Sequence, residues 1–276
     1  MSSACRSLSL LLAAAGLLPA ATLRVCADPD SLPFSNQRGE GIENRLAQLV
    51  ARDLGLQLEF VWWPQRGHFI RNTLAANRCD VLMSLPSGMS GALTTMPWYS
   101  STYVFIQRRG SAPPVTSLTD DRLSGMRIGI HMVGDGYAPP AVVLGRRGLA
   151  ERIKGYSLFG SPDEANPPAR LIEAVSHGDI DIAIAWGPLA GYFSRHSDLE
   201  VTPVSPPSYL GVPFTYSISA AVREGDTALR DSLNAVFRKE CASVRSLLAE
   251  YAFPIKQPPG EDTGCASALQ SSASLR

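Results

Sequence analysis

The feature that most constrains the fold is a repeated alternation of strand-like and helix-like segments, interrupted once by a polar, proline-rich stretch. The first unit reads as strand, helix, strand, helix, strand, over residues 23–27, 42–54, 57–62, 69–77 and 80–85. This order predicts parallel strands that are joined by right-handed crossovers.

A second unit follows the stretch Arg-Arg-Gly-Ser-Ala-Pro-Pro at 108–114, which is typical of a linker. The same alternation then returns, with strands at 126–131, 156–159, 181–185 and 199–204, partial helix at 146–153 and a helix at 168–177. A β-rich run at 214–222 and two amphipathic helices at 226–241 and 243–251 come last.

These two units predict an α/β protein with two lobes, each a mixed, mainly parallel sheet flanked by helices, with a hinge and a central cleft. We expect the first lobe to comprise residues 22–107 and 213–256, and the second lobe residues 108–212. The cleft between such lobes is the expected ligand site.

The N-terminus is typical of a secretory signal. Arg6 precedes an apolar run from Leu8 to Leu18, which is too short to span a bilayer, and small residues follow at Ala20 and Ala21. We expect residues 1–21 to be removed; the alternative is a buried N-terminal helix. The Pro-, Gly- and Ser-rich tail at 257–276 is expected to be mostly disordered.

Four cysteines remain after the signal, and an even number in an exported chain indicates two disulfides. Three pairings can be drawn. We favour Cys26–Cys79, because Cys26 ends one strand and Cys79 opens its expected parallel neighbour, and Cys241–Cys265, which would tie down the C-terminal tail.

Several classes of function are disfavoured by the sequence. The 25 basic and 25 acidic residues balance, which gives no basic excess for nucleic acid, and no later stretch of 18 apolar residues predicts membrane insertion. We expect no metal and no cofactor, since Cys-x-x-Cys and His-x-x-x-His spacings are absent. Motifs of hydrolases, P-loop proteins and dinucleotide enzymes are also absent, so we expect no enzyme.

The stretch Trp62–Arg71 is the strongest candidate for a binding surface. It lies between a predicted strand and a predicted helix, where open α/β sheets carry their binding residues. Two adjacent tryptophans, Gln65, Arg66 and Arg71 would form one wall of a cleft or a partner surface. The alternative is that one tryptophan packs in the core.

Other candidates carry a structural alternative beside the functional one. Asp28 could accept a ligand hydrogen bond or cap a turn, and Glu43 could bind a ligand or simply favour a helix start. Trp98 and Tyr99 could stack on a ligand or pack between the lobes. His131 closes a strand near the expected cleft but is more often a structural histidine.

Over almost the whole mature length, the chain resembles the type II periplasmic solute-binding proteins. The residues that carry this resemblance are 23–28 with Pro33-Phe34, Gly41-Ile42-Glu43, Gly178–Ala183 and Arg223–Arg230. A narrower resemblance, to the quinoprotein dehydrogenase-associated proteins of the MoxJ/XoxJ type, rests on 25–29, 32–36, 62–71, 78–81 and 94–105. The subfamily commonly has Arg-Arg-Gly where this chain has Arg66-Gly67-His68.

The narrower resemblance implies an accessory role for a periplasmic methanol or alcohol dehydrogenase that uses pyrroloquinoline quinone (PQQ), or for its cytochrome c. Ordinary amino-acid binders hold the ligand carboxylate with an arginine and the ammonium with an aspartate. Here the corresponding positions are Gly88 and Trp186. Without both charged anchors, a partner segment or a small aromatic ligand fits better than a free amino acid.

We therefore expect a non-catalytic periplasmic accessory protein. The alternatives are a transporter's receptor for an uncharged or aromatic solute, and a cleft lyase or dehydratase using Asp28 or Glu43 as base. The expected ligand- or partner-binding residues are Asp28, Phe34, Glu43, Trp62, Trp63, Gln65, Arg66, Arg71, Trp98, Tyr99, Tyr103, His131 and Trp186.

Overall fold

The structure is a computed structural model, and it describes residues 21–133, 136–160, 164 and 166–256. The expected signal segment up to Ala20 and the expected disordered tail from residue 257 lie outside the described residues.

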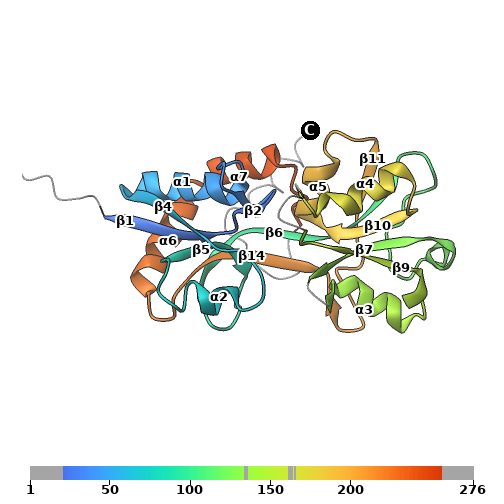
Figure 1. Cartoon of the computed structure of the whole chain (residues 1–276), viewed down its shortest axis with the longest axis horizontal. Coiled ribbons are helices and arrows are strands. Elements are labelled where there is room, and N and C mark those ends of the chain that lie inside the picture. Colours follow the sequence, from blue (N-terminus) through green and yellow to red (C-terminus); the bar gives the residue numbers. More distant parts are fainter. Residues whose placement is uncertain (1–20, 134–135, 161–163, 165, 257–276) are drawn as a thin grey trace, which may run out of the picture.

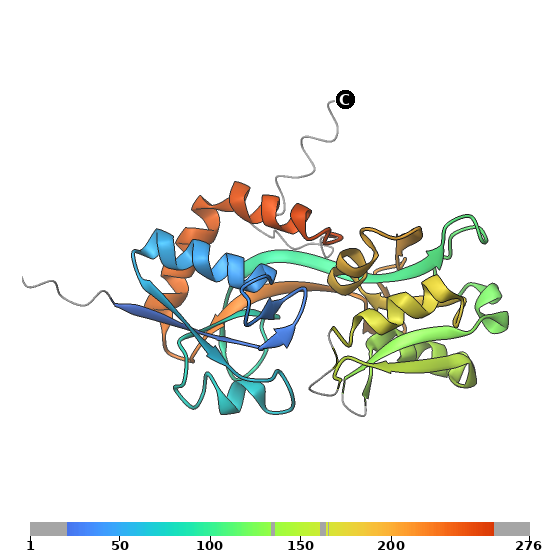
Figure 2. The same ribbon diagram turned by 45° about the horizontal axis from the view of Figure 1, so that its top comes forward.

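Two lobes lie side by side and are joined by two long strands, β6 (Leu93–Arg108) and β14 (Thr215–Val222) (Figures 1 and 2). β6 pairs with β14 as far as Thr102 and with β10 and β11 from Tyr103 onward. The predicted two-lobe α/β architecture with a hinge is confirmed.

The sheet of the first lobe has the strand order β4–β1–β5–β14–β6. β1 pairs in parallel with both β4 and β5, as the alternation of strands and helices predicts. β14 runs antiparallel to β5 and to β6, which makes the sheet mixed. The other strands of this lobe are β1 (Thr22–Ala27), β4 (Gln57–Trp62), β5 (Val81–Pro86) and the short pair β2 (Asp30–Ser31) and β3 (Ser35–Asn36).

Helices cover this sheet with their apolar faces. Leu46 and Val50 of α1 and Phe237 of α6 are fully buried in the same cluster as Trp98. A side chain at Gly41, just before α1, would place its Cβ 2.1 Å from the Phe34 carbonyl oxygen, so glycine permits this close approach. The helices are α1 (Ile42–Leu54), α2 (Phe69–Asn72), α6 (Thr227–Lys239) and α7 (Cys241–Glu250).

In the second lobe, β7 lies between β9 and β10 and is parallel to both. Its core contains Phe105, Ile128 and Ile182 on one side of the sheet, and Val104 and Leu171 on the other. The elements are β7 (Ile128–Val133), β8 (Gly136–Tyr137), β9 (Ile153–Ser157), β10 (Ile182–Trp186), β11 (Leu199–Pro203), β12 (Ser208–Tyr209), β13 (Val212–Pro213), α3 (Pro139–Arg146), α4 (Ala169–His177), α5 (Gly187–Ser194) and the 3-10 turns η1 (Asp121–Gly125) and η2 (Ala150–Arg152).

Two helices of this lobe differ from the sequence prediction. Partial helix was expected at 146–153, but α3 ends at Arg146 and only the short turn η2 follows. α5 was not predicted at all, because Gly187, Pro188 and Gly191 are poor helix formers in isolation.

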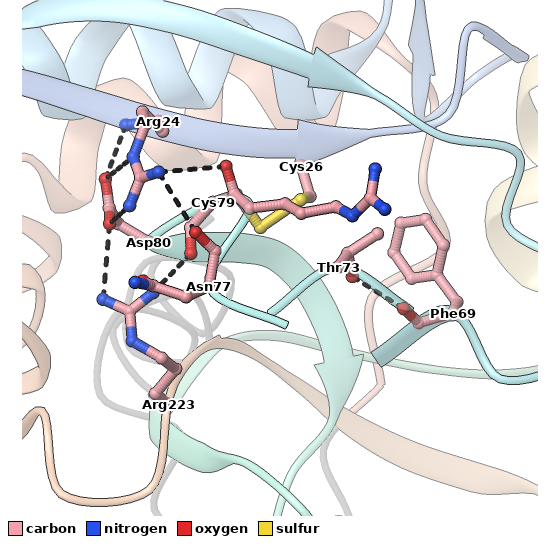
Figure 3. Close-up of a disulfide and its surroundings, with 9 residues drawn as sticks. Arg24, Cys26, Phe69, Thr73, Asn77, Cys79, Asp80 and Arg223 are labelled. Carbon is pink, nitrogen blue, oxygen red and sulfur yellow. Dashed lines mark hydrogen bonds and ion pairs between the residues drawn. A yellow bond between two sulfur atoms is a disulfide. The ribbon is translucent and has the colours of Figure 1, made fainter. Parts of the chain in front are cut away.

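The predicted disulfide between Cys26 and Cys79 is confirmed, and it joins the end of β1 to the residue before Asp80 (Figure 3). Beside it, Asp80 accepts hydrogen bonds from the side chains of Arg24, at 2.7 and 3.1 Å, and of Arg223, at 3.3 Å. These ion pairs and the disulfide fix this edge of the first lobe. Cys265 lies outside the described residues, so its pairing with Cys241 stays a prediction.

Candidate functional site

The two lobes approach each other at a cavity of about 280 Å³. Asp28 and Arg66 line it from the first lobe, and Phe159 and Pro167 line it from the second. The Arg66 guanidinium lies 5.4 Å from the centroid of the Phe159 ring, a cation–π contact that bridges the lobes. This cavity is the mouth of the interlobe cleft.

Asp28 connects two loops at this mouth. Its Oδ1 accepts a hydrogen bond from the Asp30 N–H at 2.9 Å, and its Oδ2 accepts one from the Gln65 N–H at 2.5 Å. Asp28 therefore holds the end of β1 against the loop after β4, and it also lines the cavity. These contacts fit both alternatives for Asp28, a cap of the turn and an acceptor of a ligand hydrogen bond.

Glu43 lies in the first turn of α1, and its backbone N–H donates to the Phe34 carbonyl at 2.8 Å. Burial, together with a smaller effect of the nearby charge of Asp28, raises the pKa of Glu43 to about 7. The Ser84 hydroxyl lies beside the carboxyl and lowers this pKa in part, although Ser84 Oγ makes no ordinary hydrogen bond to any described residue. Below pH 7, Glu43 is thus a neutral acid that can donate a hydrogen bond.

An aromatic group occupies the place where the hinge strands meet the second lobe. The ring of Trp186, at the end of β10, lies 5.5 Å from Tyr103 of β6 and 5.9 Å from Tyr216 of β14. The Trp186 indole N–H donates toward the Tyr99 hydroxyl, and burial raises the pKa of Tyr99. Tyr216 was not among the predicted candidates; the alternation of polar and apolar residues at 215–219 was its only sequence signal.

Several candidates lie in the protein interior rather than on an open surface. Trp98 is 1% exposed and its Nε1–H donates to the Met83 carbonyl at 2.8 Å. Tyr99 is equally buried and packs against Phe253, with ring centroids 5.6 Å apart, and Phe34 contacts the same ring at 6.1 Å. For Trp98 and Tyr99 this burial fits the packing alternative.

His131 lies apart from the other candidates, inside the second lobe. It is 3% exposed, and its Nε2 lies 3.0 Å from the Pro168 carbonyl oxygen. Burial lowers the pKa of His131 to about 4, which keeps the imidazole neutral near pH 7. These contacts fit the alternative of a structural histidine.

The Trp62–Arg71 block is partly open to solvent. Trp62 stacks on Phe60 with ring centroids 5.0 Å apart, and the Arg78 guanidinium lies 4.7 Å from the Trp63 ring. Both tryptophans are half-buried. Gln65, Arg66 and Arg71 are exposed, so this stretch offers both apolar surface and positive charge.

Gly88 occupies the position at which amino-acid binders carry the arginine that holds the ligand carboxylate. Its N–H donates to Thr94 Oγ1 at 3.1 Å.

Within residues 21–133, 136–160, 164 and 166–256, no three His, Cys, Asp or Glu side chains gather as metal ligands do. The same residues include no helix with the length and apolar character needed to cross a bilayer.

No protein-family profile matches the chain. It is similar to the protein MoxJ of Methylorubrum extorquens, with 31% identity over 250 residues, 86% of this chain and 82% of the relative. Among solved structures, XoxJ of Methylobacterium extorquens AM1, titled a periplasmic binding protein, is 33% identical with a TM-score of 0.70 and covers 86% of this chain and all of its own. MxaJ of Methylophaga aminisulfidivorans MPT has a TM-score of 0.75 at 26% identity, over 85% of this chain and all of its own.

Proposed function

The chain belongs to the MoxJ/XoxJ family of periplasmic binding proteins, and on this basis we propose that it is a non-catalytic accessory factor for a PQQ-dependent methanol or alcohol dehydrogenase. The protein works in the periplasm after removal of its N-terminal signal. Its partner is the dehydrogenase itself or the cytochrome c that accepts its electrons. The interlobe cleft binds a segment of that partner or a small aromatic ligand.

The observation that carries this proposal is the set of aromatic and arginine side chains found where the two lobes meet. Aromatic rings of Tyr103, Trp186 and Tyr216 gather where the hinge strands meet the second lobe, and Arg66 and Phe159 meet at the cleft mouth. Aromatic and arginine side chains are the residue types that dominate the binding energy of protein interfaces. These aromatic and arginine side chains suit an aromatic or apolar group with one polar end.

A neutral Glu43 also disfavours a zwitterionic amino acid as the ligand. An ammonium group is best neutralised by an ionised carboxylate, whereas Glu43 stays protonated up to about pH 7. With Gly88 and Trp186 at the two anchor positions, this chain lacks the charged pair that the wider superfamily uses. A partner segment is the better-supported occupant.

The second candidate function is that of a transporter's receptor for an uncharged or aromatic solute. The cluster of aromatic rings around Trp186 favours it, because aromatic rings can stack on a small flat molecule. A thermal-shift screen separates the two candidates, since a solute that binds only the folded protein raises its melting temperature.

Binding of the purified mature protein to the dehydrogenase and to its cytochrome tests the proposal. We expect Phe159→Ala, which removes the ring at the cleft mouth, to weaken binding about tenfold. Tyr137→Ala is the matched control, because Tyr137 is an aromatic residue of the same lobe that is 48% exposed and does not line the cleft. Absence of binding to both partners, together with stabilisation by one metabolite, would favour the solute receptor.

A further inference from the structure

A second concave surface lies on the first lobe, beside the cleft mouth. It is a groove of about 490 Å³ between the loop after β4, the short helix α2 and the turn that connects β5 to β6. Arg66 is the one residue that lines both this groove and the cleft mouth, among the described lining residues. The remainder of the groove is a separate surface.

The floor of this groove is apolar and firmly held. Phe69 and Ile70 line it, and both pack on the buried cluster that contains the disulfide between Cys26 and Cys79. Thr73 Oγ1 donates to the Phe69 carbonyl at 2.7 Å (Figure 3). Met89 also lines the groove and is 44% exposed, so it adds to the accessible apolar surface. The groove therefore offers apolar surface without having to reorganise.

Positive charge surrounds this floor without compensation. The two arginines Arg66 and Arg71 line the groove and are exposed, and no acidic side chain is among its described lining residues. Within the part of the chain that the structure describes, neither Arg66 nor Arg71 forms an ion pair, whereas Arg24 and Arg127 are each paired with an aspartate. Since the chain as a whole has no net charge, this excess is local.

From this arrangement we infer that the groove binds a segment of a partner protein in which carboxylate side chains flank a bulky apolar side chain. The carboxylates pair with Arg66 and Arg71, whose guanidinium groups can each take a carboxylate in bidentate fashion. The apolar side chain lies on Phe69 and Ile70 and is covered by Met89. The identity of the partner rests on the proposed function. The chemistry of the groove does not depend on it.

A partner carboxylate on Arg66 would compete with the contact between Arg66 and Phe159. Occupation of the groove thus weakens one link between the lobes. Arg71 takes no part in that link, so its substitution tests the groove without disturbing the cleft mouth.

Calorimetry with short peptides tests the groove directly. The probes are Asp-Glu-Leu-Phe-Glu-Asp and Lys-Lys-Leu-Phe-Lys-Lys, both with blocked ends. We expect the acidic peptide to bind at least about tenfold more tightly than the basic one, and less tightly as salt is raised. Arg71→Glu and Met89→Asp should each weaken the acidic peptide about tenfold. Equal binding of the two peptides would overturn the inference.

The matched control is Arg152→Glu, which reverses an exposed arginine of the second lobe outside the groove. It should leave the affinity within about twofold of the wild type; a loss as large as that of Arg71→Glu would mean nonspecific attraction and would overturn the inference. The same variants against the dehydrogenase and its cytochrome separate the two claims. Peptide binding without binding to either partner rejects the proposed function alone, and partner binding with peptides that fail rejects the groove alone.

Discussion

Replacing Glu43 with glutamine should make the protein more stable at alkaline pH. The pKa of Glu43 is about 7 in the folded protein, against an ordinary value of 4.5. Between these two values the folded state holds a proton that the unfolded state has released. The free energy of unfolding therefore falls as pH rises through this window, by about 3 kcal/mol in total, since one pKa unit corresponds to about 1.4 kcal/mol.

Glutamine does not titrate, so the Glu43→Gln variant escapes this loss. The stability of the variant relative to the wild type should rise by about 2.5 kcal/mol between pH 5 and pH 8. Urea unfolding followed by tryptophan fluorescence at both pH values measures this difference. If the difference in unfolding free energy between the two proteins stayed constant with pH, the raised pKa of Glu43 would be refuted.

The comparison with the variant is needed because His131 acts in the opposite direction. Its pKa is about 4 in the folded protein and 6.5 ordinarily, so the stability that it contributes is present above pH 6.5 and is lost as pH falls toward 4. In the wild type, the two effects offset each other between about pH 4.5 and 6.5. The difference between wild type and Glu43→Gln cancels the contribution of His131.

Three further variants test the packing, each by equilibrium urea unfolding. Asp80→Asn should cost about 1–3 kcal/mol, because the carboxylate that Arg24 and a second arginine share loses its charge; an unchanged midpoint would mean that the ion pairs contribute nothing. Replacing Cys26 and Cys79 with serine opens a loop of sequence separation 53 and should cost about 4 kcal/mol, and equal stability of the reduced and oxidised wild type would contradict this. Gly191→Ala should destabilise by more than about 1 kcal/mol, because its Cβ would lie 1.9 Å from a carbonyl oxygen of the C-terminal segment; a neutral result would mean that this segment moves freely.

The sequence predicts those parts of the fold that depend on local periodicity. Strands β1, β4 and β5 are parallel as expected, and the position of Cys79 just before β5 makes its bond to Cys26 predictable. α5 was missed because its helix is determined by tertiary contacts. Because Gly187 and Gly191 have no Cβ, the helix can pack closely on β6 and on the C-terminal segment.

The candidate site was harder to predict, because the same residue types serve cleft and core. Pro97, just before Trp98, lies inside β6 at a shift of register opposite Ser219. Proline fits a strand at such an irregularity, and the strand then continues with Trp98 turned into the core. Phe159 was overlooked because its contact with Arg66 joins residues that are 93 positions apart in the chain.

The most direct test of the account is calorimetric binding of the mature protein to its host's quinoprotein alcohol dehydrogenase, with and without PQQ. Phe159→Ala serves as the variant, since the Phe159 ring lines the cleft mouth and contacts the Arg66 guanidinium. The account predicts binding to one form of the enzyme, weakened in the variant. Absence of binding to either form of the enzyme and to its cytochrome would contradict it and would leave the small-molecule receptor as the better description.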